Sequence, residues 1–597
     1  MSLSAFAPPG MIGLLRWISC LVVLGSPLHA GVSLTFRHLW NGKPLAIPGQ
    51  PLLTASGEKI AFSRLDYLLS GLRLLGQRDG STPSTWLHRK DWFSYVDAFN
   101  PAELLPLSLG ELPAGDYTVL QFQVGLDKPT DEADPNQYPA GHPLNPNRNN
   151  LHWTPQGGYI FLAMEGHLRQ DLNTGGFAYH LGNSWNRTTI SLPLSPPLRG
   201  PALIRVDFHL DRIFNGTQPL RVSENPSTHS RKDDEIAHTL KQRLASAFEI
   251  AGIEHTRPTA RANPSPTPTL TGTPYRFRVA RGFPLPSLPT APPLTEERVA
   301  LGKRLFHDPL LSRTNRQSCA SCHQAAHALA DPRRFSEGAT GALGTRNSMP
   351  LFNLAWKNSF FWDGSSSSLR QQVLHPIQSA IEMHESLPQA FSDLEAANYG
   401  PLFRSAFGSP RITAERLGIA LEQFLLTLTS YDSRFDRATR GELELSAQEK
   451  RGFELFMTEH DPRRGLRGAD CFHCHGGALF TNHRFHNNGL QDERDRGLEL
   501  VTGSPGDRNR FITPSLRNIA LTAPYMHDGR FQTLEEVVDH YNSGLHRSPT
   551  LDPNLAKHPQ EGLGLETAEK AALVAFLKSL TDPQFLLPAP APAVPGQ

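Results

Sequence analysis

The order of hydrophobic and polar residues divides the chain into two parts with different periods. From residue 31, apolar and polar side chains alternate, as in a strand with one buried face. The run from Tyr159 to Met164 is continuously apolar, which is typical of a strand buried on both faces. We therefore predict an all-β, sandwich-like domain over residues 31–250, with a short helix near Glu235 to Ile250. The clearest alternating runs are Val32 to His38, Leu120 to Leu126 and Ile204 to Leu210.

The C-terminal half instead follows a helical period. Thr295 has the pattern of a helix N-cap, and Ser446 with Glu449 has that of a capping box. Apolar residues between Leu573 and Leu580 mark a final amphipathic helix. The pattern predicts a mainly α domain over residues 277–585.

Proline-rich and terminal segments bound these two domains. Residues 251–276 are rich in proline and threonine and predict an extended linker, and residues 586–597 form a Pro/Ala-rich tail. Residues 1–30 have the pattern of a secretory signal peptide, with Arg16 before an apolar run that is too short for a stable membrane span. We expect a periplasmic or secreted protein. The net charge of +1 gives no indication of a nucleic-acid partner.

Two C-x-x-C-H motifs hold four of the five cysteines, and the fifth, Cys20, lies in the predicted signal peptide. This motif attaches c-type haem through two thioethers, and its histidine becomes an axial iron ligand. A zinc site or a disulfide is disfavoured, because the two motifs lie far apart in the sequence. We predict two covalent haems. The first uses Cys319, Cys322 and axial His323, and the second uses Cys471, Cys474 and axial His475.

The segments around the two motifs repeat each other. Gly302-Lys-Arg-Leu-Phe precedes the first motif, Gly452-Phe-Glu-Leu-Phe precedes the second, and matched segments follow each of them. Two cytochrome-c-like units in tandem are the simplest explanation. In this register, Tyr541 of the second unit corresponds to Pro376 of the first.

The mismatch at this position suggests different iron environments. If the position faces the distal side of each haem, Tyr541 is the second axial ligand of haem 2, while the first iron is open to peroxide. A phenolate ligand favours high oxidation states of iron. Tyr541 could also be a core residue, and Met526 and Met383 are rival sixth ligands.

The C-terminal domain resembles the bacterial dihaem cytochrome c peroxidase and MauG family over its whole length. The resemblance is carried by LGKRLFHDPLLS, CASCH, GTRNSMPLFNLAW, FFWDG, CFHCH, TPSLRNIALTAPYMHDG and TLEEVVDHY. It implies that Trp362 relays electrons between the haems and that Gln372 and Glu382 form the distal pocket of haem 1. Glu382 would be the acid–base group for a peroxide proton. The resemblance also implies a structural Ca²⁺ near Asn347, Thr522 and Pro524.

Two departures from ordinary peroxidases of this family point to MauG and the related MbnH enzymes. The loop Ser336 to Gly344 lacks the distal histidine that often closes the first haem, and Tyr541 stands where many peroxidases use methionine. The enzymes of the MauG and MbnH type use H2O2 to form a high-valent two-iron state and oxidise a protein side chain.

The N-terminal domain resembles the MbnP-like copper-binding family, in which a dihaem partner converts a tryptophan to kynurenine. The resemblance is carried by Phe36-Arg-His, Gly141-His-Pro-Leu, His152-Trp153 before GYIF, and His180-Leu-Gly. Where the family often has a W-x-W pair, only Trp153 remains. Trp153 is the candidate for modification, with Trp40 second. The candidate copper ligands are His38, His142, His152 and His180.

We therefore expect an H2O2-dependent dihaem oxidoreductase that oxidises Trp153 of its own N-terminal domain, or of the same domain in another copy of the chain. The linker would hold enzyme and substrate at a high local concentration. Two alternatives remain. One is a peroxidase that takes electrons from a small cytochrome or cupredoxin, and the other is a non-catalytic protein that binds copper and haem.

Overall fold

The computed structural model describes residues 31–45, 49–77, 85–113, 115–153, 157–170, 173–255, 272–490 and 492–586. The predicted signal peptide, much of the predicted linker and the end of the predicted tail lie outside these residues. Within them, no helix combines the length and apolar character needed to cross a membrane.

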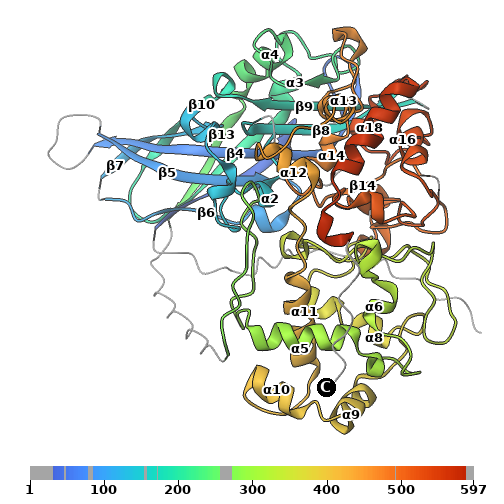
Figure 1. The fold of residues 1–597 in the computed structure, drawn as a ribbon. Helices are drawn as coiled ribbons and strands as arrows, with labels where there is room; N and C mark the ends of the chain where they lie inside the picture. The colour runs from blue at the N-terminus through green and yellow to red at the C-terminus, as the bar shows by residue number, and fades with distance from the viewer. Residues whose placement is uncertain are drawn as a thin grey trace, which may run out of the picture.

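Two β-sheets form the N-terminal domain and share one hydrophobic core (Figure 1). The smaller sheet contains β1 (Val32–Trp40), β2 (Lys43–Pro44), β6 (Leu107–Gly110), β11 (Ala202–His209) and β13 (Phe248–His255). The larger sheet contains β3 (Leu52–Leu53), β4 (Lys59–Gln77), β5 (Thr85–Asp97), β7 (Asp116–Val124), β8 (Ile160–Gln170), β9 (Asn173–Gly182), β10 (Thr188–Leu198) and β12 (Ser227–Thr228). Short helices join them: α1 (Lys128–Asp131), α2 (Pro146–Asn149), α3 (Leu210–Phe214) and α4 (Glu235–Leu244).

The alternating runs become strands as predicted. Val32, Leu34 and Phe36 of β1 are buried in the shared core, because β1 pairs in parallel with β11 at the middle of its sheet. The helix predicted over Glu235 to Ile250 is too long, however, since α4 ends at Leu244. Beyond it the chain forms β13, which pairs with β11 and continues to His255, past the predicted domain boundary at residue 250.

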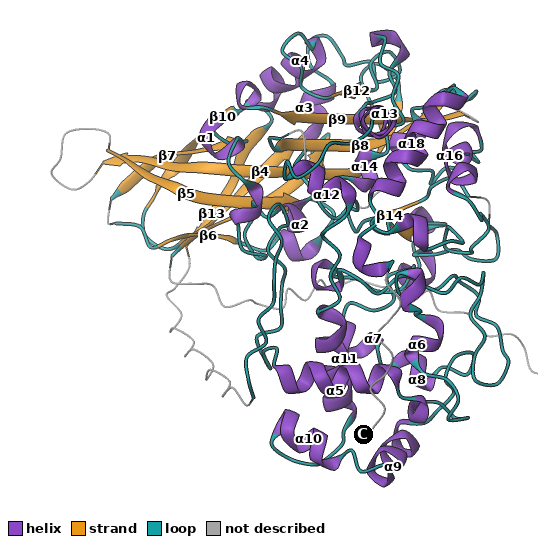
Figure 2. Ribbon diagram, in the orientation of Figure 1, coloured by secondary structure: helices purple, strands orange, loops and turns teal. Residues whose placement is uncertain are grey.

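Helices dominate the C-terminal domain, which consists of two units (Figure 2). The first unit contains α5 (Glu296–His307), α6 (Cys319–Cys322), α7 (Leu369–Gln372), α8 (His375–Gln378), α9 (Leu387–Ala396), α10 (Gly400–Phe407) and α11 (Ala414–Leu426). The second contains α12 (Arg434–Thr439), α13 (Ala447–Met457), α14 (Phe472–His475), α15 (Glu499–Thr502), α16 (Leu534–Ser543), α17 (Pro553–Ala556) and α18 (Thr567–Ser579), with strands β14 (Phe485–His486) and β15 (Phe511–Ile512). The predicted caps are present, because Thr295 accepts a hydrogen bond from the backbone N–H of Arg298, and Ser446 with Glu449 forms a capping box.

A pair of equivalent helix crossings shows the internal repeat in three dimensions. Helix α5 packs on α11 at Gly302, where a Cβ atom would lie 1.9 Å from the carbonyl oxygen of Ala420. Helix α13 packs on α18 at Gly452 in the same way, with a Cβ atom placed 1.9 Å from the carbonyl oxygen of Ala572. Only glycine permits such a close approach of two helix backbones. The repeated glycine in the two sequence segments is therefore the contact that builds each unit.

Substitution Gly452→Ala is expected to destabilise the second unit by about 1–3 kcal/mol, because α13 and α18 must separate to admit the methyl group. The matched control is Gly400→Ala, where the added Cβ would meet Pro410 at an ordinary 3.5 Å. The measurement is the midpoint of chemical unfolding, followed by circular dichroism. Equal midpoints for the two variants would contradict the close crossing.

The larger sheet of the N-terminal domain docks on the second unit (Figure 1). Helix α17 lies against β9 so closely that a Cβ atom at Gly176 would be 1.8 Å from the carbonyl oxygen of Pro553. The ring of buried His167 in β8 donates a 2.6 Å hydrogen bond from Nε2 to the carbonyl of Leu551. The two domains therefore share a packed interface that faces the second C-x-x-C-H motif.

Candidate functional site

The second C-x-x-C-H motif lies on α14 and opens onto a largely apolar cavity. Cys471, Cys474 and His475 line this cavity together with the buried apolar residues of α16 and α18. Nδ1 of His475 donates a 3.1 Å hydrogen bond to the carbonyl of Phe480. Burial lowers the pKa of His475 to about 4. The imidazole is thus neutral and oriented, with Nε2 left for a metal ion.

Both rival sixth ligands of the second unit reach the same cavity. Tyr541, on α16, and Met526, in the preceding loop, line it. The side-chain amide of Asn488 lies between them, and Nδ2 is 3.3 Å from the hydroxyl of Tyr541 and 3.4 Å from the sulfur of Met526. Burial raises the pKa of Tyr541. Ionisation of this phenol in the cavity therefore requires a cation such as ferric iron beside it.

Tyr541→Phe tests the choice between these ligands, because it removes only the phenol oxygen. We expect it to change the optical and electron paramagnetic resonance spectra of the ferric second haem. Met526→Leu should leave both spectra as in the wild type. A change with Met526→Leu and none with Tyr541→Phe would reverse the assignment.

The first C-x-x-C-H motif has the same local geometry. It forms α6, and Nδ1 of His323 donates a 3.0 Å hydrogen bond to the carbonyl of Leu329. Burial raises the pKa of Cys319 to about 12, with smaller contributions from Cys322 and then Glu382. Glu382 also raises the pKa of Cys322, after burial and Asp331. The predicted distal carboxylate therefore lies close to the first attachment site.

Glu382 lies in the loop that follows α8. Its carbonyl accepts a 2.6 Å hydrogen bond from the backbone N–H of Ala339, and Oε2 is 3.8 Å from Nδ1 of His375. Gln372, the other predicted distal residue, is half-buried at the end of α7. The helix that contains Tyr541 in the second unit is broken here into α7 and α8, with Pro376 in the first turn of α8. The position equivalent to Tyr541 is thus occupied by proline, which has no side-chain ligand atom.

Trp362 links the two units. Its indole Nε1 donates a 2.8 Å hydrogen bond to the carbonyl of Asn347, and its own carbonyl accepts one of 2.9 Å from Ile512. The side chain is 9% exposed and lines the cavity of the second unit. Asn347, Thr522 and Pro524, the predicted calcium ligands, line the same cavity. These four residues thus come together at the junction of the units.

Trp153 lies at the interface between the domains. It lines a pocket with His152 and His180 of its own domain and with Phe472 and His473 of the second C-x-x-C-H motif. The far edge of its indole packs on Gly182, where a Cβ atom would lie 2.6 Å from the ring. Trp40, the second candidate, is buried in the core of the N-terminal domain against Phe62 and Phe214.

The four predicted copper ligands do not form one cluster among the described residues. His38 lies in the core, 3.0 Å from the hydroxyl of Tyr67, and burial lowers its pKa to about 3. His142 stacks on Tyr138, and its Nδ1 accepts a hydrogen bond from the backbone of Leu144. His152 packs edge-on against Tyr159.

His180 instead gathers with two histidines that the sequence analysis did not select. One ring nitrogen each from His180, His229 and His473 lies within 4.8 Å of the others. The sequence shows His473 directly before the second cysteine of the second C-x-x-C-H motif. Its position beside His180, however, depends on the docking of the two domains. His229 comes from the loop after β12.

An ionic network holds the interface near this pocket. Nη1 of Arg484, next to β14, lies 2.9 Å from Oδ2 of Asp66, and Nη2 lies 3.0 Å from Oδ2 of Asp97. Arg64 contacts Asp66 and Glu165 at 2.7 Å each. Asp66 is fully buried, so these arginines neutralise a carboxylate that has no access to water.

Comparison with known proteins gives two family matches. Residues 296–444 match the family described as di-haem cytochrome c peroxidase, and residues 29–230 match the family described as MbnP. The methylamine utilization protein MauG of Methylorubrum extorquens is 40% identical over 316 residues, which covers 51% of this chain and 83% of that protein. The chain belongs to the di-haem cytochrome c peroxidase and MauG family. Its N-terminal domain is MbnP-like.

Other relatives span the same half of the chain. MauG of Methylophilus methylotrophus is 34% identical, and the match covers 53% of this chain and 92% of that protein. The cytochrome c551 peroxidase of Pseudomonas aeruginosa is 32% identical, and the match covers 49% of this chain and 81% of that protein. A solved structure, described as the crystal structure of a MauG-like protein associated with microbial copper homeostasis, has 35% sequence identity to this chain. The match covers 53% of this chain and 98% of that protein, with a TM-score of 0.47. These relationships make the chain a dihaem peroxidase-type oxidoreductase.

The residues present fit the two c-type haems that the family implies. Each motif supplies two cysteines that form no disulfide, and each axial histidine is oriented by a backbone carbonyl through Nδ1. In the second unit the motif opens onto a cavity with about 1540 Å³ of atom-free space, counting solvent at its mouth. Cys319, Cys322 and His323 would hold haem 1, and Cys471, Cys474 and His475 would hold haem 2.

Proposed function

We propose that the protein uses H2O2 to oxidise Trp153 of its own N-terminal domain to kynurenine. The observation that carries this proposal is the pocket that Trp153 shares with Phe472 and His473, the two residues between the cysteines of the second haem motif. A tryptophan in this position lies beside the haem-bearing segment of the same chain. No diffusion of a separate substrate is needed.

The overall oxidation balances with two molecules of H2O2. The bond between C2 and C3 of the indole breaks, and one oxygen atom is added to each of these carbons to give N-formylkynurenine. The two peroxides together accept four electrons and leave two molecules of water. Hydrolysis then releases formate and leaves kynurenine. When bound, the haems would reduce each H2O2 and hold the resulting oxidising equivalents until electrons leave the indole.

The protein residues have distinct parts in this proposal. Glu382 would receive and return the peroxide proton near the first haem, and Gln372 would position the peroxide. Trp362 would conduct electrons between the units, a role supported by its buried position at their junction. Tyr541 would ligate the second iron. Ca²⁺ near Asn347, Thr522 and Pro524 would stabilise this junction.

The MbnP-like domain suggests that copper is the cargo of the modified protein. Imidazole nitrogens suit copper, and His152 and His180 share the pocket of Trp153. His38 and His142 have local partners elsewhere, so they are the weaker candidates. We place the mature protein in the periplasm or outside the cell, in agreement with the signal-like N-terminus and with the attachment of c-type haem outside the cytoplasm.

Similarity to cytochrome c551 peroxidase favours one alternative, in which an external redox protein donates the electrons. Peptide mass spectrometry separates the two functions. The haem-loaded protein is treated with H2O2, and the tryptic peptide between Arg148 and Arg169, which contains Trp153, is analysed. We expect the mass of kynurenine in this peptide, while Trp185, which is 40% exposed, stays intact. An intact Trp153 together with rapid turnover of a cytochrome or cupredoxin donor would contradict the proposal.

A further inference from the structure

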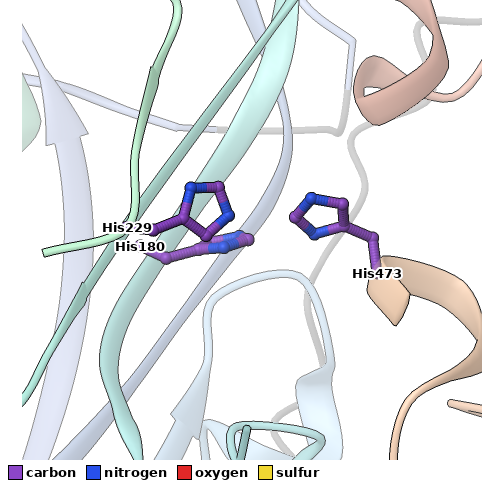
Figure 3. Close-up of side chains that lie close together, drawn as sticks. All are labelled: His180, His229 and His473. Atoms are coloured by element: carbon purple, nitrogen blue, oxygen red, sulfur yellow. The ribbon is translucent and has the colours of Figure 1, made fainter. Parts of the chain in front are cut away.

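Three histidines from both domains face one another at the interface (Figure 3). His180 and His229 belong to the N-terminal domain, and His473 reaches towards them from the second haem motif. Their ring centroids form a nearly equilateral triangle, with separations of 5.2 Å, 5.3 Å and 5.6 Å. To form metal–nitrogen bonds of about 2.0–2.1 Å, the three rings would rotate slightly and bring one nitrogen of each closer to the others.

A different carboxylate contacts each of the three rings. Nε2 of His180 is 2.9 Å from Glu165, Nδ1 of His229 is 2.9 Å from Glu459, and Nε2 of His473 is 3.0 Å from Asp470. A carboxylate beside one ring nitrogen commonly orients a histidine that ligates a metal through the other nitrogen. Nε2 of His473 also lies 3.4 Å from Nζ of Lys557.

The remaining nitrogens include buried atoms without a partner. Nδ1 of His180 and both ring nitrogens of His229 have no hydrogen bond, although these atoms are shielded from solvent. Such buried polar atoms are costly unless something binds them.

The charges around the three rings leave room for a cation. Two cations contact the three carboxylates. Lys557 lies 2.9 Å from Glu459 and 3.1 Å from Asp470, and Arg64, which also contacts Asp66, lies 2.7 Å from Glu165. The carboxylates around the three rings thus outnumber the cations. Three imidazoles without a thiolate suit copper or zinc rather than Mg²⁺ or Ca²⁺.

We propose that His180, His229 and His473 form a metal site for copper or zinc, shared between the MbnP-like domain and the haem domain. Because its third ligand comes from the second haem motif, the bound metal fastens the two domains together beside haem 2. The site does not require oxidation of Trp153. It shares His180 with the copper ligands of the proposed function, but it adds a ligand from the haem domain and does not rest on the oxidation chemistry.

Metal binding to the full-length, haem-loaded protein tests this site. Chelator-treated protein is supplied with Cu or Zn in separate samples, and bound metal is measured by elemental mass spectrometry, with electron paramagnetic resonance for Cu(II). We expect one metal ion per chain in addition to the two irons. The three variants His180→Ala, His229→Ala and His473→Ala should each weaken binding by at least about tenfold, and Glu459→Gln by about 10–100-fold.

Two further samples serve as controls. His238→Ala, on α4, removes an exposed ring whose Nε2 donates a hydrogen bond to the carbonyl of Lys232, and should bind metal like the wild type. Protein that has never been treated with H2O2 should bind the metal as well as treated protein does, so that failure of the tryptophan chemistry and failure of the metal site are separate results. An unchanged haem spectrum in His473→Ala shows that this variant has folded. Wild-type metal affinity in folded His473→Ala, or no retained metal in the wild type, would overturn the shared site.

Discussion

Glu382→Gln is expected to slow the consumption of H2O2 by about 10²–10⁴-fold, the usual contribution of a positioned acid–base group. The amide has nearly the shape of the carboxylate but cannot take up and return a proton. The backbone of the loop should be unaffected, because Ala339 bonds the carbonyl of residue 382 and not its side chain. The measurement is the rate of peroxide loss in a stopped-flow experiment.

Glu385→Gln is the matched control for this change. Glu385 lies in the same loop, and its carboxylate accepts a hydrogen bond from the backbone N–H of Ser386. We expect this variant to keep the wild-type rate, and both variants to keep the wild-type haem spectra. Equal peroxide rates for the two variants would exclude Glu382 as the acid–base group.

Arg484→Met is expected to weaken docking of the two domains by about 3–5 kcal/mol, because it leaves the buried carboxylates of Asp66 and Asp97 without one of their cations. Arg64 still contacts Asp66, but Asp97 loses its arginine partner. Hydrogen–deuterium exchange in β9 and α17 should therefore increase. Conversion of Trp153 should slow at the same time, since its pocket includes both domains.

The defect of Arg484→Met should depend on pH. Burial, followed by the charge of Asp66, already raises the pKa of Asp97, and Arg484 opposes this rise. Without the arginine the pKa of docked Asp97 rises further, so docking is favoured where Asp97 is protonated and is lost as the pH rises through this pKa. Arg494→Met, at a side chain that is 94% exposed, is the control. A pH-independent increase in exchange, or the same increase in the control, would argue against the role of Arg484.

The sequence predicted the tandem units, and it marked the two motifs that would hold the haems, because these features are local. Cys471 and His475 are fixed by one turn of helix, and the repeated glycines at Gly302 and Gly452 mark equivalent helix crossings. The alternating runs likewise predicted the strands. The helix after Glu235 was extended too far, because pairing of Phe248 to His255 with β11 outweighs the local helical pattern.

Features that depend on docking could not be predicted from the sequence. His180 was selected for its neighbours in the chain, but His229 and His473 join it only when the MbnP-like domain meets α14. The ionic contact between Arg484 and Asp66 joins residues separated by 418 positions. Neither residue type nor spacing carries this information, because the contact follows from the fit of two folded surfaces.

The measurement that tests the central claim most directly is a mixing experiment between two forms of the full chain. Active protein with a uniform isotope label is mixed with unlabelled Glu382→Gln protein, treated with H2O2 and digested with trypsin. Mass spectrometry then reports kynurenine separately in the labelled and unlabelled peptides that contain Trp153. We predict kynurenine in the labelled peptide alone, because each haem domain oxidises the tryptophan docked on it. Equal kynurenine in both peptides, or intact Trp153 in both, would contradict oxidation within the chain.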